Sequence, residues 1–357
     1  MGRVHVIAEM GLSHCCDLQK ACQLALAAKN CGADSVKTQI IFAHELFHPN
    51  AEKLILPTGE KSLFDFFADF QCGFEFFSQL KNYCHEIGIG FSASVFGLQS
   101  WEWLQKLELP YCKIASPELN HIPLLREIGK REDIPLFLSV GLSKLSDIEK
   151  ALECLPEKQK KVLLHCVVAY PAVEENYNLR LIETLGRIFG LPVGLSDHSL
   201  HPYLLPTLAV AMGATVAEKH FCLSKDGDGP DDAMALNPDE FRLMVEKIRW
   251  AESLSSQEII AAMVEEFGEN RVEKILGSGK KVHSPDEAAN YGRTNRSIHF
   301  IKDKKSGEVI LPGDIAVLRT GGKLSVGISP EFFRDVQGAV LKCDVKSGEG
   351  LIFSHLF

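Results

Sequence analysis

Two histidines lie at the ends of neighbouring predicted strands. His198 follows an apolar run that begins at Pro192, and His220 ends the next such run. A pair of imidazoles, together with water and substrate oxygens, suits a divalent cation that acts as a Lewis acid. The alternative is a structural pair that hydrogen-bonds to Asp197 and Glu218. The pattern favours His198 and His220 as metal ligands.

Three lysines also lie at predicted strand ends: Lys37, Lys113 and Lys219. A lysine in this position can bind phosphate or carboxylate as a point charge, or it can form a Schiff base with a carbonyl substrate. The hydroxyl groups of Ser116 and Ser139 would donate hydrogen bonds to the same anion. These residues predict an anion-binding site, and a Schiff-base aldolase on Lys113 or Lys219 is the alternative chemistry.

Other polar side chains gather at the same predicted strand ends. They are Glu9, Gln39, Ser92, Ser94, Glu118, Tyr170 and Ser196. Any one of them could be a buried polar group that hydrogen bonds satisfy. Because polar residues recur at the ends of eight otherwise apolar strands, the whole set predicts an active site.

The elements that would position these residues alternate regularly from residue 4 to about residue 253. Eight β-branched runs are separated by eight amphipathic helical stretches. The predicted strands are 4–10, 35–39, 90–95, 111–115, 136–140, 162–167, 192–195 and 215–220. Strict alternation predicts an α/β fold, a (β/α)8 TIM barrel, with its active site at the carboxyl ends of the strands.

Composition along the chain divides it further. We predict a catalytic barrel over residues 1–254, a polar linker over 255–296, and a small β-rich domain with frequent turn signals over 297–357. Residues 41–73 form a long insertion after the second predicted strand. Long connections in compact domains are usually functional or disordered, so we expect a loop on the substrate side.

The composition also excludes several classes of protein. The chain has 357 residues, with 38 Lys and Arg against 47 Asp and Glu, a formal charge of -9. This balance argues against nucleic acid or a membrane surface as a partner. The longest nearly apolar stretch, 203–217, is shorter than the roughly 20 residues of a membrane span. We find no secretory signal, and the eleven cysteines include no C-x-x-C, so we expect reduced thiols in a cytoplasmic protein.

Six runs resemble motifs of the N-acetylneuraminate (sialic acid) synthase family, in that family's order and near its spacing. They are Ile7–Gly11, Gly32–Gln39, Lys113–Glu118, Gly194–His198, Glu218–Phe221 and Gly229–Asp231. The tail resembles the family's antifreeze-like (SAF) C-terminal domain through Ser306–Glu308, Leu318–Arg319 and Gly327–Pro330. The resemblance covers nearly the whole chain and implies a TIM barrel followed by an SAF domain.

The resemblance implies a condensation of phosphoenolpyruvate with an N-acylated amino-hexose, such as N-acetylmannosamine or its phosphate, and with water. The products would be a nine-carbon 2-keto sugar acid and phosphate, released by C–O cleavage. Mn²⁺, or else Mg²⁺ or Co²⁺, would lie on His198 and His220. The implied substrate-binding residues are Lys37, Lys113, Ser116, Ser139, Ser196 and Arg319. The implied catalytic residues are Glu9, Gln39, Glu118, Tyr170 and Asp231.

Arg319 matches a tail arginine that, in the family, enters the partner subunit's site and contacts the N-acyl group. The resemblance therefore implies a domain-swapped homodimer. Ser13, Val140 and Val168 depart from the family pattern and bear on the choice of sugar. A legionaminic- or pseudaminic-acid-type synthase of the same family is the nearest alternative. The aldolase and a non-catalytic carbohydrate-binding protein are more distant ones.

Overall fold

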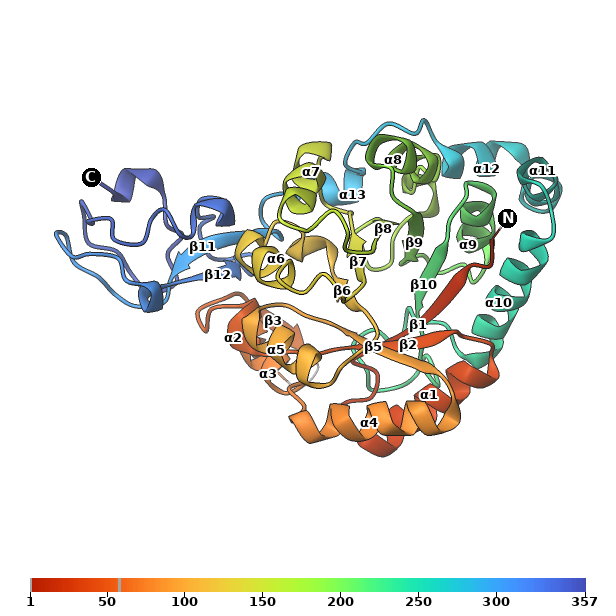
Figure 1. The fold of residues 1–357 in the computed structure, drawn as a ribbon, viewed down its shortest axis with the longest axis horizontal. Coiled ribbons are helices and arrows are strands. Elements are labelled where there is room, and N and C mark those ends of the chain that lie inside the picture. Colours follow the sequence, from red (N-terminus) through yellow and green to blue (C-terminus); the bar gives the residue numbers. More distant parts are fainter. Residues whose placement is uncertain (1, 57–58) are drawn as a thin grey trace.

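Eight parallel strands close into a barrel in the computed structural model, which describes residues 2–56 and 59–357 (Figure 1). The order around the barrel is β1-β10-β9-β8-β7-β6-β5-β2. The bounds are β1 His5–Gly11, β2 Ser35–Gln39, β5 Gly90–Ser94, β6 Cys112–Ile114, β7 Leu136–Ser139, β8 Lys161–Cys166, β9 Val193–Asp197 and β10 Val216–His220. The predicted (β/α)8 barrel is confirmed.

A helix follows each barrel strand and covers the outside of the barrel. These helices are α1 Leu18–Asn30, α4 Phe74–Ile87, α5 Leu98–Lys106, α6 Ile122–Ile128, α7 Leu145–Glu153, α8 Leu181–Phe189, α9 Leu204–Ala211 and α10 Pro238–Glu252. Local sequence sets their ends. Asp17 caps α1 by accepting hydrogen bonds from two backbone amides, and Asn237 and Glu240 form a reciprocal capping box at the start of α10. The capped helices then bury one apolar face, as α1 does with Leu24.

The insertion after β2 is folded rather than irregular in its described part. It contains α2 (Ala43–Leu46), the antiparallel hairpin of β3 (Lys53–Leu56) and β4 (Gly59–Ser62), and α3 (Leu63–Ala68). Phe67 of α3 stacks on Phe47 with ring centroids 5.4 Å apart. Leu46 and Phe96 belong to the same small apolar cluster. This cluster fixes α3 beside the carboxyl ends of the strands.

The segment 255–296, which we expected to be a linker, is largely helical. It contains α11 (Ser256–Phe267), α12 (Glu269–Leu276) and α13 (Pro285–Ala288). Ile259, Met263 and Val272 are buried in the same apolar core as the barrel helices. Ile259 and Met263 are four residues apart on one face of α11, and Val272 lies in α12. Both helices therefore extend the helical layer of the barrel, and the residues after α12 connect it to the tail.

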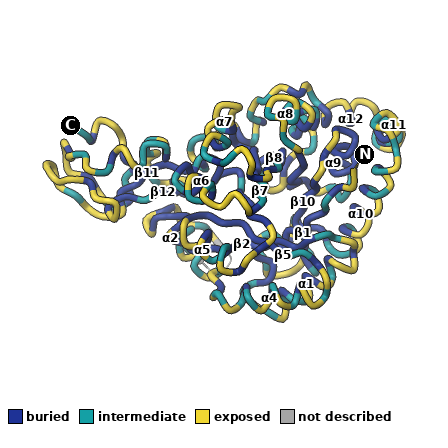
Figure 2. Tube along the Cα trace, in the orientation of Figure 1, coloured by how far each residue is buried: buried dark blue, intermediate teal, exposed yellow. Residues whose placement is uncertain are grey.

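The tail is β-rich, as predicted, and has a core of its own. Strands β11 (Arg296–Phe300) and β12 (Ile315–Arg319) pair antiparallel. Ile298, Phe300 and Leu341 are buried in a cluster that is separate from the barrel core. The tail projects from one side of the barrel (Figure 1). Buried residues continue from the barrel into β11 and β12, whereas the outer loops of the tail are mostly exposed (Figure 2).

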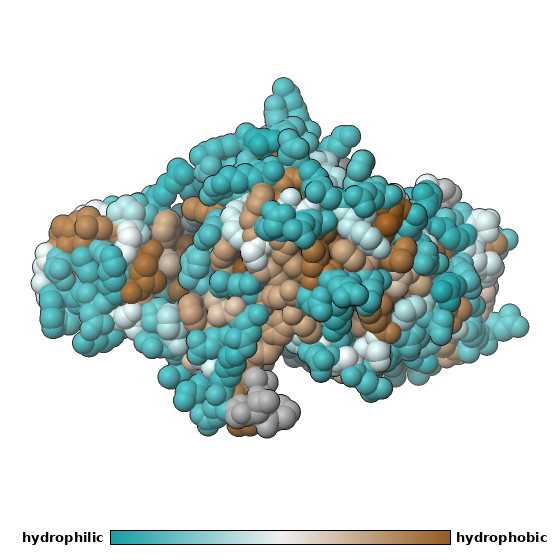
Figure 3. Space-filling view, turned by 90° about the horizontal axis from the view of Figure 1, so that it is seen from below, coloured by the Kyte–Doolittle hydropathy of each residue, from teal (hydrophilic) through white to brown (hydrophobic). Residues whose placement is uncertain are grey.

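In the view from below, a band of apolar residues crosses the middle of a face that is otherwise mainly hydrophilic (Figure 3). Within residues 2–56 and 59–357, every helix is too short or too polar to span a bilayer.

Candidate active site

A cavity of about 290 Å³ opens at the carboxyl ends of the barrel strands. Twelve of the thirteen predicted site residues line it. They are Glu9, Lys37, Gln39, Lys113, Ser116, Ser139, Tyr170, Ser196, His198, His220, Asp231 and Arg319. The structure therefore brings residues from seven barrel strands or their following loops, together with one tail residue, into a single site. Glu118 is the predicted residue that does not line it.

The lysines at the base of the cavity are held by carboxylates. Lys37 Nζ lies 2.5 Å from Glu9 Oε2 and 3.9 Å from Glu218 Oε2. Lys113 Nζ lies 3.7 Å from Glu218 Oε1 and donates a hydrogen bond to Ser139 Oγ at 2.7 Å. All these groups are almost completely buried. The two ammonium groups thus share Glu218 between them.

Burial and charge act differently on the two lysines. Burial opposes the charge on Lys37, but Glu218 and Glu9 outweigh it, so the pKa of Lys37 is raised. Burial lowers the pKa of Lys113; Glu218 offsets this effect only in part, and Lys37 adds repulsion. Lys37 is therefore a fixed cation, whereas Lys113 loses its proton more readily than an ordinary lysine.

Lys219 does not belong to this site, although the sequence placed it with the other two lysines. Its ammonium group pairs with the buried carboxylate of Asp197 and donates to the backbone carbonyl oxygens of Ser199 and His201. Successive side chains of a strand point to opposite faces, so Glu218 and His220 point into the barrel while Lys219 points outward. The expectation that Lys219 binds substrate or forms a Schiff base in the cavity is wrong.

Glu218, to which the sequence analysis assigned no catalytic or binding role, lies at the centre of the site. It accepts a hydrogen bond from Ser196 Oγ at 3.1 Å and faces both Lys37 and Lys113. Burial raises its pKa, but the two lysines outweigh burial and the pKa of Glu218 is lowered overall. Side chains two residues apart on a strand point to the same face. The predicted role of His220 was therefore the signal that could have assigned Glu218 to the cavity.

The two predicted metal ligands lie side by side in the cavity wall. The ring centroids of His198 and His220 are 5.7 Å apart, and Tyr170 stacks on His198 at 4.2 Å. His198 Nδ1 lies 2.8 Å from the carbonyl oxygen of Val167. A carbonyl only accepts, so Nδ1 carries the hydrogen and Nε2 keeps its lone pair.

The protonation state of His198 also suits a ligand. Burial lowers its pKa to about 3, and His220 adds to this effect. The imidazole is therefore neutral at neutral pH, with its outer nitrogen fixed by a backbone carbonyl in the way that protein metal ligands are usually held. His220 Nδ1 lies 3.7 Å from Asp231 Oδ2, a further oxygen donor. The donor set fits a divalent cation.

Glu118 instead joins the tail to the barrel. Its carboxylate pairs with Arg296 through Oε2 and with Arg319 through Oε1, where Arg319 Nε lies at 3.1 Å. Glu118 and Arg296 have no exposed side-chain surface. Burial raises the pKa of Glu118, but Arg296 and Arg319 outweigh it and the pKa is lowered. The sequence analysis did not predict a role for Arg296, because no sequence pattern near Arg296 indicates an ion pair with a residue of the barrel.

Arg319 reaches the cavity of its own chain. Its guanidinium carbon lies 5.9 Å from the ring centroids of both Phe47 and Phe96, which are distances of cation–π contact. The family resemblance led us to expect this arginine in the partner's site. In the single chain described here, the tail completes the mouth of the barrel that precedes it.

Comparison with known proteins supports the family that the motifs indicated. Residues 24–259 match the NeuB family. The chain belongs to the NeuB family. This NeuB-family chain is 32% identical over 361 residues to the N,N'-diacetyllegionaminic acid synthase of Legionella pneumophila, covering 98% of this chain and 94% of that protein. It is 31% identical over 324 residues to human N-acetylneuraminate-9-phosphate synthase, and the match covers 88% of this chain and 83% of the human protein.

A solved structure resembles the whole NeuB-family chain. The spore coat polysaccharide biosynthesis protein SpsE of Bacillus subtilis superposes with a TM-score of 0.84 at 32% sequence identity, covering 100% of this chain and 96% of that one. Because the match extends over the full chain, it includes both the barrel and the β-rich tail.

Proposed function

We propose that this protein condenses phosphoenolpyruvate with an N-acylated amino-hexose and water, giving a nine-carbon 2-keto sugar acid and phosphate. One observation carries the proposal: two lysines with serine neighbours lie in the same cavity as a neighbouring pair of histidines suited to a metal. Two NeuB-family relatives are named as an N,N'-diacetyllegionaminic acid synthase and an N-acetylneuraminate-9-phosphate synthase, and these names support the same reaction class.

Phosphoenolpyruvate would occupy the base of the cavity. Lys37 and Lys113 would bind its phosphate and carboxylate as point charges, and Ser116, Ser139 and Ser196 would add hydroxyl donors. The hydrogen bond from Lys113 to Ser139, and the short Lys37–Glu9 pair, hold the cations in place before the substrate arrives. Such preorganised charge is the largest contribution that most enzymes make to catalysis.

His198 and His220 would hold a divalent cation, with Mn²⁺ our first choice and Mg²⁺ or Co²⁺ as alternatives. When bound, this ion would polarise the aldehyde of the open-chain sugar as a Lewis acid. Tyr170 stacks on His198 and limits the rotation of its ring. The protein would thereby fix the aldehyde above the phosphoenolpyruvate site.

The remaining polar residues would position the attacking water and transfer protons. C3 of phosphoenolpyruvate attacks the aldehyde carbon, water adds to the cation formed at C2, and the tetrahedral intermediate loses phosphate by C–O cleavage. Among the carboxylates that line the cavity, Glu9 and Asp231 would act as general bases; Glu9 Oε1 accepts a hydrogen bond from Gln39 Nε2 at 3.1 Å. Glu118 would act indirectly, by orienting Arg319.

The acceptor would lie between Arg319 and α3, whose Phe66 and Phe67 line the mouth of the cavity. The guanidinium of Arg319 would donate to the N-acyl oxygen. N-acetylmannosamine, its 6-phosphate, and the diacetamido-trideoxy-hexoses that lead to legionaminic or pseudaminic acids are all candidate acceptors. Val168, which departs from the family pattern, also lines the cavity and is a candidate specificity residue.

We further propose that two chains form a domain-swapped homodimer, in which each SAF-type tail completes the partner's cavity. The tail follows a connection, residues 277–295, that contains only the short helix α13, so the same Glu118 and Arg319 contacts could form between chains. Co-expressed His198→Ala and Arg319→Ala chains test this arrangement. A swapped heterodimer regains activity because one intact barrel meets one intact tail, whereas a heterodimer with unswapped tails does not.

The decisive experiment measures phosphate release from phosphoenolpyruvate with Mn²⁺ and a panel of N-acyl hexosamines. We expect release with at least one acceptor, loss of activity with a chelator, and transfer of a label in the bridging oxygen of phosphoenolpyruvate into phosphate. Failure to release phosphate with every member of the panel would refute the proposal.

The lowered pKa of Lys113 favours one alternative, a Schiff-base aldolase. That enzyme would be trapped on Lys113 by borohydride in the presence of pyruvate and would keep its activity after chelation. The synthase predicts the opposite result in both measurements.

A further inference from the structure

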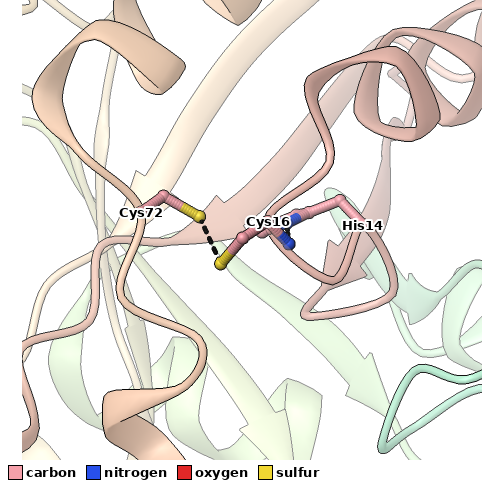
Figure 4. A group of neighbouring side chains, drawn as sticks. All are labelled: His14, Cys16 and Cys72. Carbon is pink, nitrogen blue, oxygen red and sulfur yellow. Dashed lines mark hydrogen bonds between the residues drawn. The ribbon is translucent and has the colours of Figure 1, made fainter.

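Two cysteines that are far apart in the sequence meet outside the cavity. The Sγ atoms of Cys16 and Cys72 are 2.8 Å apart, across a separation of 56 residues. Figure 4 shows the two sulfur atoms pointing toward each other, with the ring of His14 next to Cys16. Cys16 is partly exposed on the loop between β1 and α1, whereas Cys72 is buried immediately before α4.

A metal site is one interpretation of these three residues, because one ligand atom from each lies within 4.8 Å of the others. The hydrogen bonds of His14 argue against it. Its Nδ1 accepts from the backbone N–H of Cys16 at 3.0 Å, and its Nε2 lies 2.9 Å from Thr38 Oγ1. The hydroxyl of Thr38 already donates to the carbonyl oxygen of Gly11, so Nε2 must be the donor to Thr38. Neither nitrogen of His14 retains a free lone pair.

The separation of the sulfur atoms also differs from that of metal ligands. Two thiolates bound tetrahedrally to Zn²⁺ at about 2.3 Å lie roughly 3.7 Å from each other. The observed 2.8 Å is closer, and it is less than 1 Å longer than the roughly 2.05 Å of a disulfide bond. The contact therefore fits a dithiol that can close to a disulfide with little movement.

The two sulfur atoms differ in a way that suits thiol oxidation. The thiol of Cys72 donates to the sulfur of Cys16, and this hydrogen bond lowers the pKa of Cys16 despite the opposing effect of burial. The same hydrogen bond, together with burial, raises the pKa of Cys72. Cys16 is thus the more accessible and the more nucleophilic of the pair. The neighbouring Cys15 is also partly exposed, but burial raises its pKa.

We propose that Cys16 and Cys72 are a redox-active pair that a hydroperoxide oxidises to a reversible disulfide. The thiolate of Cys16 attacks one oxygen of the hydroperoxide; the O–O bond breaks, water or an alcohol leaves, and Cys16 becomes a sulfenic acid. The sulfur of Cys72 then attacks the sulfur of Cys16, and the displaced hydroxide takes up the thiol proton as water. Two thiols are oxidised by two electrons, and one hydroperoxide is reduced.

The disulfide would restrain the mouth of the cavity. Cys16 follows the cavity residue Leu12 along the chain, and Cys72 follows α3, which carries Phe66 and Phe67. A covalent bond between these two loops would tie α3 to the loop after β1. We expect slower amide hydrogen exchange in residues 63–72 of the oxidised protein, by at least severalfold.

The test uses the full chain, reduced, freed of reductant and treated with stoichiometric hydrogen peroxide before alkylation and peptide mapping. Cys15 and Cys16 share one tryptic peptide, so the experiment is run on Cys15→Ser as well as on the native chain. We expect a linked pair of peptides containing residues 16 and 72, which dithiothreitol reverses. The exposed Cys343 should lose its free thiol at least tenfold more slowly than Cys16.

The variants Cys16→Ser and Cys72→Ser separate the two steps. In Cys72→Ser, Cys16 should be trapped by dimedone as a sulfenic acid, and oxidation should no longer slow the exchange of residues 63–72. The proposal is overturned if Cys16 and Cys72 remain unlinked in Cys15→Ser, or if Cys343 reacts as fast as Cys16. It is also overturned if the purified chain binds one Zn²⁺ or Cu⁺ that both His14→Ala and Cys16→Ser abolish. These measurements do not depend on the reaction that the enzyme catalyses.

Discussion

Glu118→Gln tests whether a buried ion pair holds the tail at the mouth of the barrel. The substitution keeps the shape of the side chain but removes the charge that faces Arg296 and Arg319. The guanidinium of Arg296, which has no exposed surface, would then lack its only carboxylate partner among the described residues. We expect the tail to detach more often while both parts stay folded.

The free-energy cost of Glu118→Gln can be estimated from the burial of the Glu118–Arg296 ion pair. Breaking a buried ion pair by removing one partner costs about 3–5 kcal/mol. Arg296 keeps the carbonyl oxygens of Phe96 at 3.0 Å and Val317 at 3.3 Å as acceptors, so we expect the lower end of that range. A loss of about 3 kcal/mol corresponds to a roughly 100-fold increase in the fraction of undocked tails.

Residue-resolved amide exchange measures this equilibrium directly. The N–H of Arg296 donates to Asn120 Oδ1 at 3.0 Å across the interface, so its exchange reports undocking. The N–H of Phe300 donates to the carbonyl oxygen of Glu349 inside the tail and reports tail unfolding. We expect protection at Arg296 to fall by about 100-fold while protection at Phe300 changes little, following the free-energy estimate above.

The matched control is Asp133→Asn, which removes one partner of the exposed, two-pronged Arg131–Asp133 pair. An exposed pair contributes little, so this variant should leave the protection at Arg296 unchanged. If Glu118→Gln lowers that protection by less than about fivefold, or no more than the control does, the buried pair does not hold the tail.

Acidification should have the same effect on the native chain. The pKa of Glu118 lies below its ordinary value of 4.5 because Arg296 and Arg319 outweigh burial. A carboxylate with a lowered pKa stabilises the docked state fully above its ordinary pKa, and this contribution is lost as the pH falls through the lowered value. The native tail should therefore loosen in acid, and Glu118→Gln should lack this component.

Three further predictions concern the cavity and its support. Arg319→Ala should raise the KM for the acceptor by about 10- to 100-fold and leave phosphoenolpyruvate binding by calorimetry unchanged, whereas equal losses would contradict its assigned role. Lys113→Ala should weaken phosphoenolpyruvate binding at least roughly tenfold in the same assay. Lys219→Met should destabilise the barrel to urea by about 3–5 kcal/mol through the unpaired Asp197, yet leave both KM values nearly unchanged; a large KM change would place Lys219 in the site.

The barrel and most of its cavity could be predicted because parallel strands bring their carboxyl ends to one face. The predicted strand bounds differ from the observed ones by at most two residues. The predicted metal ligands His198 and His220 therefore line the same cavity as Lys37 and Lys113, the lysines predicted to bind an anion. Folding of residues 256–276 onto the barrel was missed because apolar residues that face the core, Ile259 and Met263 among them, are interspersed with as many polar ones.

The sequence-based predictions of the site were wrong in two situations. In one, the side chains of adjacent residues point to opposite faces of a strand; in the other, residues far apart in the sequence form a pair. Glu218 and Lys219 are neighbours in the sequence, yet one lies in the cavity and the other is fixed outside the barrel by Asp197. Only the alternation of side-chain directions along a strand distinguishes their positions, and amino-acid composition carries no information on that alternation. The partner of Arg296 is 178 residues away along the chain, so no local pattern could reveal that Glu118 was engaged.

The charges of the cavity bear on how an acidic protein would bind the proposed acidic substrate. The net charge of -9 describes the whole chain, but the cavity lining holds Lys37, Lys113 and Arg319 against Glu9, Glu218 and Asp231. These six charged groups balance, so they alone offer phosphoenolpyruvate no excess positive charge. A divalent cation on His198 and His220 would supply that excess, because a bound ion is often the largest charge in a site. On this argument, the metal would contribute to anion binding as well as to activation of the aldehyde.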